Sequence, residues 1–176
     1  MLCGKKVYLR ALERDDIPRM QKWVNDPDIR RNLLFTCPVS LDAEKAWYES
    51  QLAEQDSRVY GIAEAESHAH IGNIGLHDID WINRKAEAGI LIGEKDFWGR
   101  GLGTDAMNAM LSHAFFTLNL HRVYLSVFAF NSRAVRSYEK CGFTREGVSR
   151  DALFQDGRYH DVVHMGMLRD EMKNEE

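Results

Sequence analysis

A glycine-rich segment in the second half of the chain restricts the possible folds more than any other feature. Residues 97–104 read Phe-Trp-Gly-Arg-Gly-Leu-Gly-Thr and join a strand-like run to a helix-like run. Glycines allow positive φ angles and a close approach of the backbone to a ligand. The helix that follows presents unpaired N–H groups and a partial positive charge, which together favour phosphate. Arg100 could add a direct charge contact. The segment predicts a pyrophosphate-binding turn, with a plain helix-capping turn as the alternative.

Two common nucleotide-binding motifs fit this segment poorly. Residues 101–106 formally satisfy the dinucleotide pattern, but that pattern needs an acidic residue about twenty positions further on. Residues 121–126 read His-Arg-Val-Tyr-Leu-Ser and contain no acid. A Walker loop needs Gly-Lys-Ser/Thr, which is absent from the chain. The glycines alone therefore leave the identity of the pyrophosphate open.

The hydrophobic pattern around the segment predicts one mixed α/β domain over residues 1–176. Helices are expected after Asp15 or Asp16, after Asp26-Pro27, after Ser40, over 104–118, and from Ser132 to Gly142. Strands are expected over residues 7–10, 58–65, 71–79, 86–92 and 121–130. Two further strands should flank Asp156-Gly157, a strong hairpin signal.

Composition excludes several classes of protein. The net charge is -4, and Lys and Arg are scattered along the sequence, which argues against nucleic-acid binding. No apolar stretch approaches the roughly 20 residues that span a bilayer, so no membrane association is expected. The first residues lack the apolar run of a signal peptide. Three cysteines are too few and too distant for a disulfide framework, which favours a reducing cytoplasm.

A second motif follows the strand expected over 121–130. Residues 131–143 read Asn-Ser-Arg-Ala-Val-Arg-Ser-Tyr-Glu-Lys-Cys-Gly-Phe. Ala134 and Tyr138 are four positions apart and share one helical face. Asn131 lies at the strand-to-helix junction, where its amide can reach a ligand. Taken alone, Tyr138 would be interpreted as core packing.

Taken together, the two segments resemble the GNAT superfamily of acetyl-CoA-dependent N-acetyltransferases. The family's motif Gln/Arg-x-x-Gly-x-Gly/Ala falls on residues 98–103, with Trp98 in place of the usual first residue. Its second motif, Asn-x-x-Ala-x-x-x-Tyr-x-x-x-Gly-Phe, is matched in full by residues 131–143. The chain looks most like the branch of ribosomal-protein N-terminal and spermidine acetyltransferases. The resemblance implies a mostly antiparallel sheet of about seven strands flanked by helices, with a splayed central strand pair.

The resemblance also implies acetyl-CoA as the co-substrate and assigns residues to it. Leu91 and Ile92 would pair with the pantetheine arm, and a backbone N–H of residues 86–92 would stabilise the developing oxyanion. Asn131 would hold the arm from the other side. The pyrophosphate would bind at the turn and helix start formed by Gly99, Arg100, Gly101, Leu102, Gly103 and Thr104.

Two catalytic candidates follow from the same resemblance. Tyr138 would protonate the departing thiolate. Glu87 would bind or deprotonate the amine, with a solvated edge-strand glutamate or a water chain left open as alternatives. Three further acids could favour a cationic acceptor or be ordinary surface acids: Asp78, Asp80 and Glu94.

The leading hypothesis is direct transfer of acetyl from acetyl-CoA to a primary amine in a ternary complex. This chemistry requires no metal, and His68 and His70 lack a third ligand nearby in sequence. A non-catalytic acyl-CoA-binding sensor or regulatory module is the alternative. The sequence does not specify the acceptor, which could be a protein N-terminus, a polyamine or another small amine. The resemblance also allows a homodimer.

Overall fold

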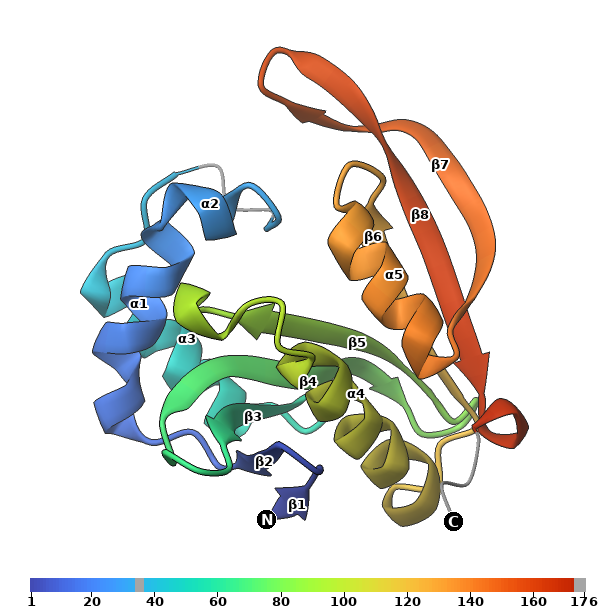
Figure 1. Cartoon of the computed structure of the whole chain (residues 1–176), viewed down its shortest axis with the longest axis horizontal. Helices are drawn as coiled ribbons and strands as arrows, with labels where there is room; N and C mark the ends of the chain where they lie inside the picture. Colours follow the sequence, from blue (N-terminus) through green and yellow to red (C-terminus); the bar gives the residue numbers. More distant parts are fainter. Residues whose placement is uncertain (34–36, 173–176) are drawn as a thin grey trace.

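Eight strands form one sheet in the computed structural model, which describes residues 1–33 and 37–172 (Figure 1). The strand order is β1-β2-β3-β4-β5-β6-β8-β7, and neighbours are antiparallel except for the parallel pair β5–β6. The strands are β1 (Leu2–Cys3), β2 (Val7–Arg10), β3 (Arg58–Glu64), β4 (His70–Asp80), β5 (Lys85–Ile92), β6 (Arg122–Phe128), β7 (Thr144–Gln155) and β8 (Arg158–Leu168).

Helices cover both faces of the sheet. In Figure 1, α4 lies in front of the central strands and α3 behind them, while β7 and β8 form a long hairpin that extends away from the body. The helices are α1 (Ile17–Asn25), α2 (Pro27–Arg30), α3 (Leu41–Ala53), α4 (Leu102–Ser112) and α5 (Ser132–Cys141). Shorter helical turns are η1 (Arg14–Asp16), η2 (Lys95–Phe97), the π-helical η3 (His113–Thr117) and η4 (Arg169–Glu171).

The buried side chains form two clusters, one for each face. The larger cluster packs the sheet against α4, η3 and α5 and includes the fully buried Met110 and Phe115. The smaller cluster contains Ile17, Met20 and Trp23 of α1, which recur at the helical spacing seen in the sequence. Leu91 of β5 packs against this second cluster, so β5 has a helix-covered environment on both faces.

Several local sequence signals are confirmed. The Asp26 carboxylate accepts a hydrogen bond from the Asp28 N–H, and Ser40 Oγ accepts one from the Ala43 N–H at 3.1 Å. Asp156 and Gly157 have φ values of 53° and 76°, as a type I′ hairpin turn requires. Gly142 ends α5 in the left-handed conformation, with a φ of 101°.

Other details of the fold differ from expectation. The sheet has eight strands rather than about seven, because Leu2–Cys3 adds a short edge strand. Asn131, rather than Ser132, caps α5, since its side chain accepts the Ala134 N–H. The helix expected over 104–118 begins at Leu102 and changes to a π-helical turn after Ser112. Asp16 precedes α1, but its carboxylate binds Arg10 and the Glu13 N–H instead of capping that helix.

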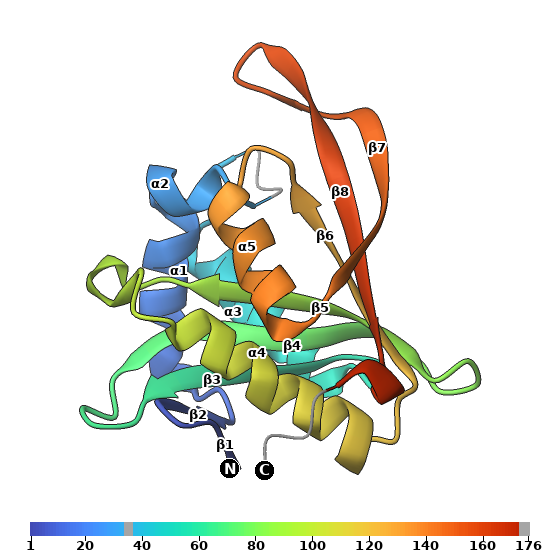
Figure 2. The same ribbon diagram turned by 45° about the vertical axis from the view of Figure 1, so that its right-hand side comes forward.

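The sheet opens between β5 and β6. The two strands pair only over Lys85–Glu87 and Arg122–Tyr124. Beyond Glu87 they diverge, as Figure 2 shows, while β5 continues to pair with β4 as far as Ile92. The sequence therefore predicted the mixed α/β class and the splayed strand pair correctly.

No helix within residues 1–33 and 37–172 is long and apolar enough to cross a membrane. The cytoplasmic location, the homodimer and the assignment of one domain to residues 1–176 stay predictions of the sequence.

Candidate active site

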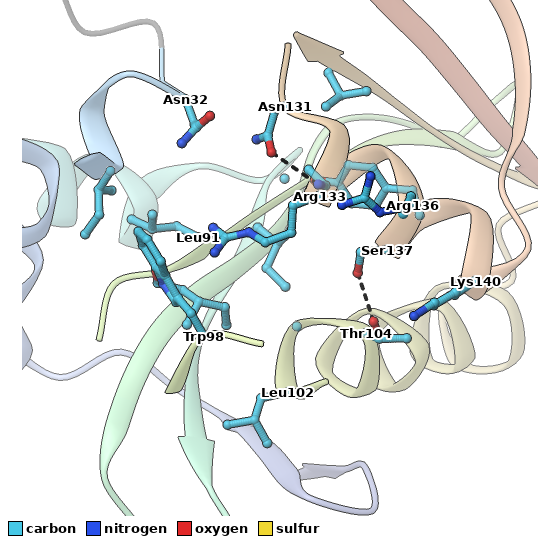
Figure 3. Close-up of a pocket in the computed structure, with 18 of the residues that line it drawn as sticks. Asn32, Leu91, Trp98, Leu102, Thr104, Asn131, Arg133, Arg136, Ser137 and Lys140 are labelled. Atoms are coloured by element: carbon cyan, nitrogen blue, oxygen red, sulfur yellow. Dashed lines mark hydrogen bonds between the residues drawn. The ribbon is translucent and has the colours of Figure 1, made fainter. Parts of the chain in front are cut away.

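A cavity of ≈ 450 Å³ lies where β5 and β6 separate (Figure 3). Its walls are the free part of β5, the glycine-rich turn, the end of β6 and one face of α5. Most of the predicted site residues line it together: Leu91, Ile92, Gly99, Gly101, Leu102, Gly103, Thr104, Asn131 and Tyr138. Arg100 and Glu87 are the two predicted site residues outside the lining.

The open edge of β5 offers backbone groups to the cavity. The Gly93 N–H donates to the Ile71 carbonyl of β4 at 2.8 Å. Because backbone groups alternate sides along an antiparallel strand, those of Ile90 and Ile92 face away from β4 and toward the opening. Trp98 Nε1 donates to the Ile92 carbonyl at 2.8 Å, which fits this orientation. The same alternation turns the backbone of Leu91 toward β4, so Ile90 and Ile92 are the residues placed to pair with an extended ligand.

The first turn of α4 forms an anion-binding end of the cavity. Gly99 and Gly101 have φ values of 75° and 80°, a region that glycine enters without strain. Gly101 is the N-cap of α4 and supplies no side-chain cap. The N–H groups that begin the helix are therefore directed at the space beside the turn, where the helix dipole also favours negative charge. This arrangement fits a pyrophosphate.

Arg100 does not add its charge to that space. Its guanidinium lies 4.9 Å from the centroid of the Phe97 ring and 3.9 Å from the Glu64 carboxylate. Only the backbone of Arg100 belongs to the side of the glycine-rich turn that faces the cavity, because its side chain points to the other side.

The positive charge of the cavity comes instead from α5. Arg133, Arg136 and Lys140 line the cavity from one helical face (Figure 3). The guanidinium of Arg133 lies 4.2 Å from the centroid of the Trp98 ring. These three residues were not predicted as part of the site, because Lys and Arg look scattered along the sequence. Their spacing of i, i+3 and i+7 was the available signal, since it places all three on one side of a helix.

Asn131 and Tyr138 contribute polar groups from the same helix. Asn131 Oδ1 accepts the Ala134 N–H at 3.2 Å, which leaves its amide N–H groups to act as donors at the cavity. Tyr138 packs edge-on against Phe143, with ring centroids 5.9 Å apart. Burial raises the pKa of Tyr138 to about 12, with a smaller contribution from Cys141. The phenol therefore keeps its proton at neutral pH and can act as an acid.

Glu87 lies beside the cavity on the opposite face of the sheet from α4. It is in register with His77 of β4 on one side and Tyr124 of β6 on the other. Burial raises the pKa of Tyr124, and the carboxylates of Glu87, Asp78 and Asp80 raise it further, while the nearby guanidinium of Arg122 acts in the opposite direction. These acids thus place a negative potential on the face where the strands begin to diverge.

The other acids considered in the sequence have structural partners. Glu94 accepts a hydrogen bond from Trp23 Nε1 at 3.1 Å. Asp80 accepts from the backbone of Ile82 and Asn83 and so holds the turn after β4. No group of three or more possible metal ligands occurs among residues 1–33 and 37–172.

Comparison with known proteins agrees with this geometry. A family model described as an acetyltransferase (GNAT) domain matches residues 6–144. A spermidine N(1)-acetyltransferase of Vibrio cholerae is 34% identical over 175 residues, covering 97% of this chain and 98% of that protein. The putative ribosomal N-acetyltransferase YdaF of Bacillus subtilis is 38% identical over 177 residues, covering 98% and 96%. The structure of spermidine N-acetyltransferase from Vibrio cholerae with CoA and spermine has a TM-score of 0.89 at 32% identity, covering 96% of this chain and 98% of that one.

Proposed function

Because this chain belongs to the GNAT family of acetyltransferases and transfers an acetyl group from acetyl-CoA to an amine, we propose that its acceptor is a polyamine. The observation that carries this proposal is the negative potential around Glu87, Asp78 and Asp80, which acts on Tyr124. A polyamine carries several positive charges, so it gains from such a field more than a singly charged amine does. The names of the Vibrio cholerae relatives support the same acceptor class.

We assign the cofactor half of the site as follows. The pyrophosphate of acetyl-CoA binds the N–H groups that begin α4, and the cations of α5 neutralise its phosphates. The pantetheine arm pairs with the backbone of Ile90 and Ile92 and accepts a hydrogen bond from Asn131. This arrangement directs the thioester to the point where β5 and β6 diverge, next to Tyr138.

The chemistry needs a proton at sulfur and a neutral amine at the carbonyl carbon. The nitrogen lone pair forms the new C–N bond, and the C–S bond breaks as the thiolate departs. Tyr138 is the assigned donor of the proton to sulfur, because it lines the cavity and is protonated at neutral pH. Glu87 is assigned to hold the ammonium groups of the acceptor at the opposite face.

A thiol-release screen tests the acceptor. Spermidine, spermine, a short peptide with a free N-terminus and an amino sugar are compared at equal concentration with saturating acetyl-CoA. We expect the polyamines to give the highest kcat/KM, and Glu87→Gln to raise the polyamine KM by roughly 3- to 10-fold while acetyl-CoA binding is unchanged. Glu66→Gln, at an exposed turn, is the matched control.

A protein amine, such as an N-terminus, is the second candidate acceptor, because YdaF, a putative ribosomal N-acetyltransferase, is 38% identical to this chain and the Vibrio cholerae enzyme 34%. The same screen separates the two. A peptide that exceeds both polyamines in kcat/KM, with no effect of Glu87→Gln, would contradict the polyamine proposal and favour the peptide.

A further inference from the structure

His77 lies on the face of the sheet that carries Glu87, where we place the acceptor amine. It lies on β4 in direct register with Glu87, so the two side chains emerge on the same face. The imidazole leans over two glycines that face each other across the strands, Gly75 of β4 and Gly89 of β5. A Cβ atom on Gly75 would lie 2.9 Å from His77 Nε2, and one on Gly89 would lie 3.6 Å from it. The ring thus occupies the space that a side chain at Gly75 would need.

This position brings His77 close to one wall of the cavity, although His77 is not itself among the lining residues. Gly89 is one of the cavity-lining residues, and it belongs to the part of β5 that has already separated from β6. Nε2 of His77 therefore lies above the strand where we place the thioester, on the side from which the acceptor approaches. Neither glycine has a side chain that would separate the imidazole from the backbone of β5 at Gly89.

The hydrogen bonds of His77 define which nitrogen is basic. Nδ1 lies 3.0 Å from Ser57 Oγ, and Ser57 Oγ donates its only hydrogen to Gln51 Oε1 at 3.2 Å. With the Gln51 amide assigned in this orientation, Ser57 can only accept, so Nδ1 carries the ring proton. Nε2 then carries the lone pair, and it has no hydrogen-bond partner among residues 1–33 and 37–172. Ser57 is buried, which fixes the arrangement.

We propose that His77 is the acceptor-side base, taking a proton from the acceptor ammonium through Nε2. The neutral amine then attacks the thioester carbonyl, the C–N bond forms, and the C–S bond breaks. Tyr138 gives its proton to the thiolate, and the proton left on the new amide nitrogen returns to Tyr138 through water. His77 releases its proton to solvent, so each ammonium acetylated yields one free proton.

The charged groups around His77 are consistent with this division of roles. Glu87 faces it from β5, and Arg58 of β3 donates to the carbonyl of Ser57. Asp78 follows it on β4. Glu87 can hold the ammonium while His77 accepts a proton from it. The inference takes its location from the acceptor site proposed above but does not depend on the acceptor being a polyamine.

The test uses the purified full chain and the amine with the highest turnover in the thiol-release screen. Values of kcat and KM are measured from about pH 6 to pH 10 for the native protein and His77→Gln. We expect a loss in kcat of about 100-fold or more near neutral pH that shrinks as pH rises, because the amine then deprotonates without help. Binding of acetyl-CoA, measured by calorimetry, should be unchanged.

Two further variants serve as controls for the effect of His77→Gln. His121→Gln, at an exposed position before β6, should behave as the native protein. Ser57→Ala keeps the imidazole but removes its hydrogen-bond partner, so we expect a smaller loss in kcat that also shrinks as pH rises. If His77→Gln fails to fold, Ser57→Ala is measured in its place. A kcat within about 3-fold of native at every pH, or a loss that is equal at every pH, would overturn the role of His77. If only peptides are acetylated, the polyamine proposal fails, and native protein and His77→Gln are compared with the peptide as the acceptor.

Discussion

Tyr138 shows how the surroundings of a single side chain set its protonation state. It lies on α5 beside the aromatic ring of Phe143, and burial raises the pKa of its hydroxyl to about 12. A raised pKa means that the hydroxyl remains protonated throughout the neutral and mildly alkaline range. The residue is thus available as a proton donor at neutral pH, and it cannot take a proton from an ammonium group because it already carries its own. This asymmetry is a reason to look for the base on the other face of the sheet.

Replacing Tyr138 with phenylalanine tests whether its hydroxyl is the proton donor to the thiolate. In Tyr138→Phe we expect kcat to fall by about 100-fold or more, because the thiolate departs without a proton donor. The dissociation constant for acetyl-CoA should stay the same, since the ring still fills its place against Phe143. Steady-state kinetics and calorimetry on the same preparation check both values. An unchanged kcat would remove Tyr138 from the mechanism.

At the scale of one element, α5 and its N-cap present three kinds of polar group to the cavity. Its N-cap Asn131 offers an amide to the cavity, and Tyr138 offers a hydroxyl. The basic stripe Arg133, Arg136 and Lys140 adds charge along the same side. The residues between them, such as Val135 and Cys141, are buried against the sheet. The helix can serve both purposes because its period separates a buried face from a ligand-binding face.

The basic stripe should govern affinity for the cofactor without affecting chemistry. In Arg136→Ala and Lys140→Ala we expect the KM for acetyl-CoA to rise roughly 3- to 10-fold each, with kcat nearly unchanged, because exposed charges are screened by solvent. Added salt should raise the native KM and reduce the difference between native and variant. Arg158→Ala, at the exposed start of β8, is the control. A variant whose kcat falls while its KM is unchanged would contradict this assignment.

At the scale of the whole molecule, a buried polar cluster joins parts of the chain that are distant in sequence. The Arg10 guanidinium donates two hydrogen bonds of 2.7 Å to Asp16, and His70 Nε2 lies 2.9 Å from Asn73 Oδ1. His70 Nδ1 lies 3.0 Å from Asp16 Oδ1 but forms no hydrogen bond. Burial lowers the pKa of His70 and outweighs the attraction of Asp16. Burial also lowers the pKa of His113 beneath the sheet.

These two histidines should make the fold sensitive to mild acid. Because their pKa values are lower in the folded protein, the unfolded chain binds more protons and the free energy of unfolding falls as pH drops through about 6.5. The slope should approach about 1.4 kcal/mol per pH unit for each histidine at most. Urea unfolding at pH 7.5 and 5.5 measures the difference in the free energy of unfolding between the two pH values.

Variants of the exposed and buried histidines give the control for that experiment. We expect His70→Gln to have a smaller difference in unfolding free energy between the two pH values than the native protein. His121→Gln, which is exposed, should retain the native difference. An equal difference in all three proteins would show that His70 does not contribute to the acid sensitivity.

The sequence by itself determined the features that depend on a few adjacent residues. The glycines at 99 and 101, the hairpin at Asp156-Gly157 and the motif from Asn131 to Phe143 have local causes: a φ angle, a turn type, a helical face. Together with the hydrophobic pattern and the family resemblance, they predicted the mixed α/β fold and acetyl-CoA correctly, and the pyrophosphate site at the glycine-rich turn stays a prediction. The tertiary structure decided what depends on strand register and side-chain direction. Arg100 points away from the cavity although it lies within the motif. His77 gains its place only because β4 and β5 align Gly75 with Gly89, and no short stretch of sequence encodes that alignment.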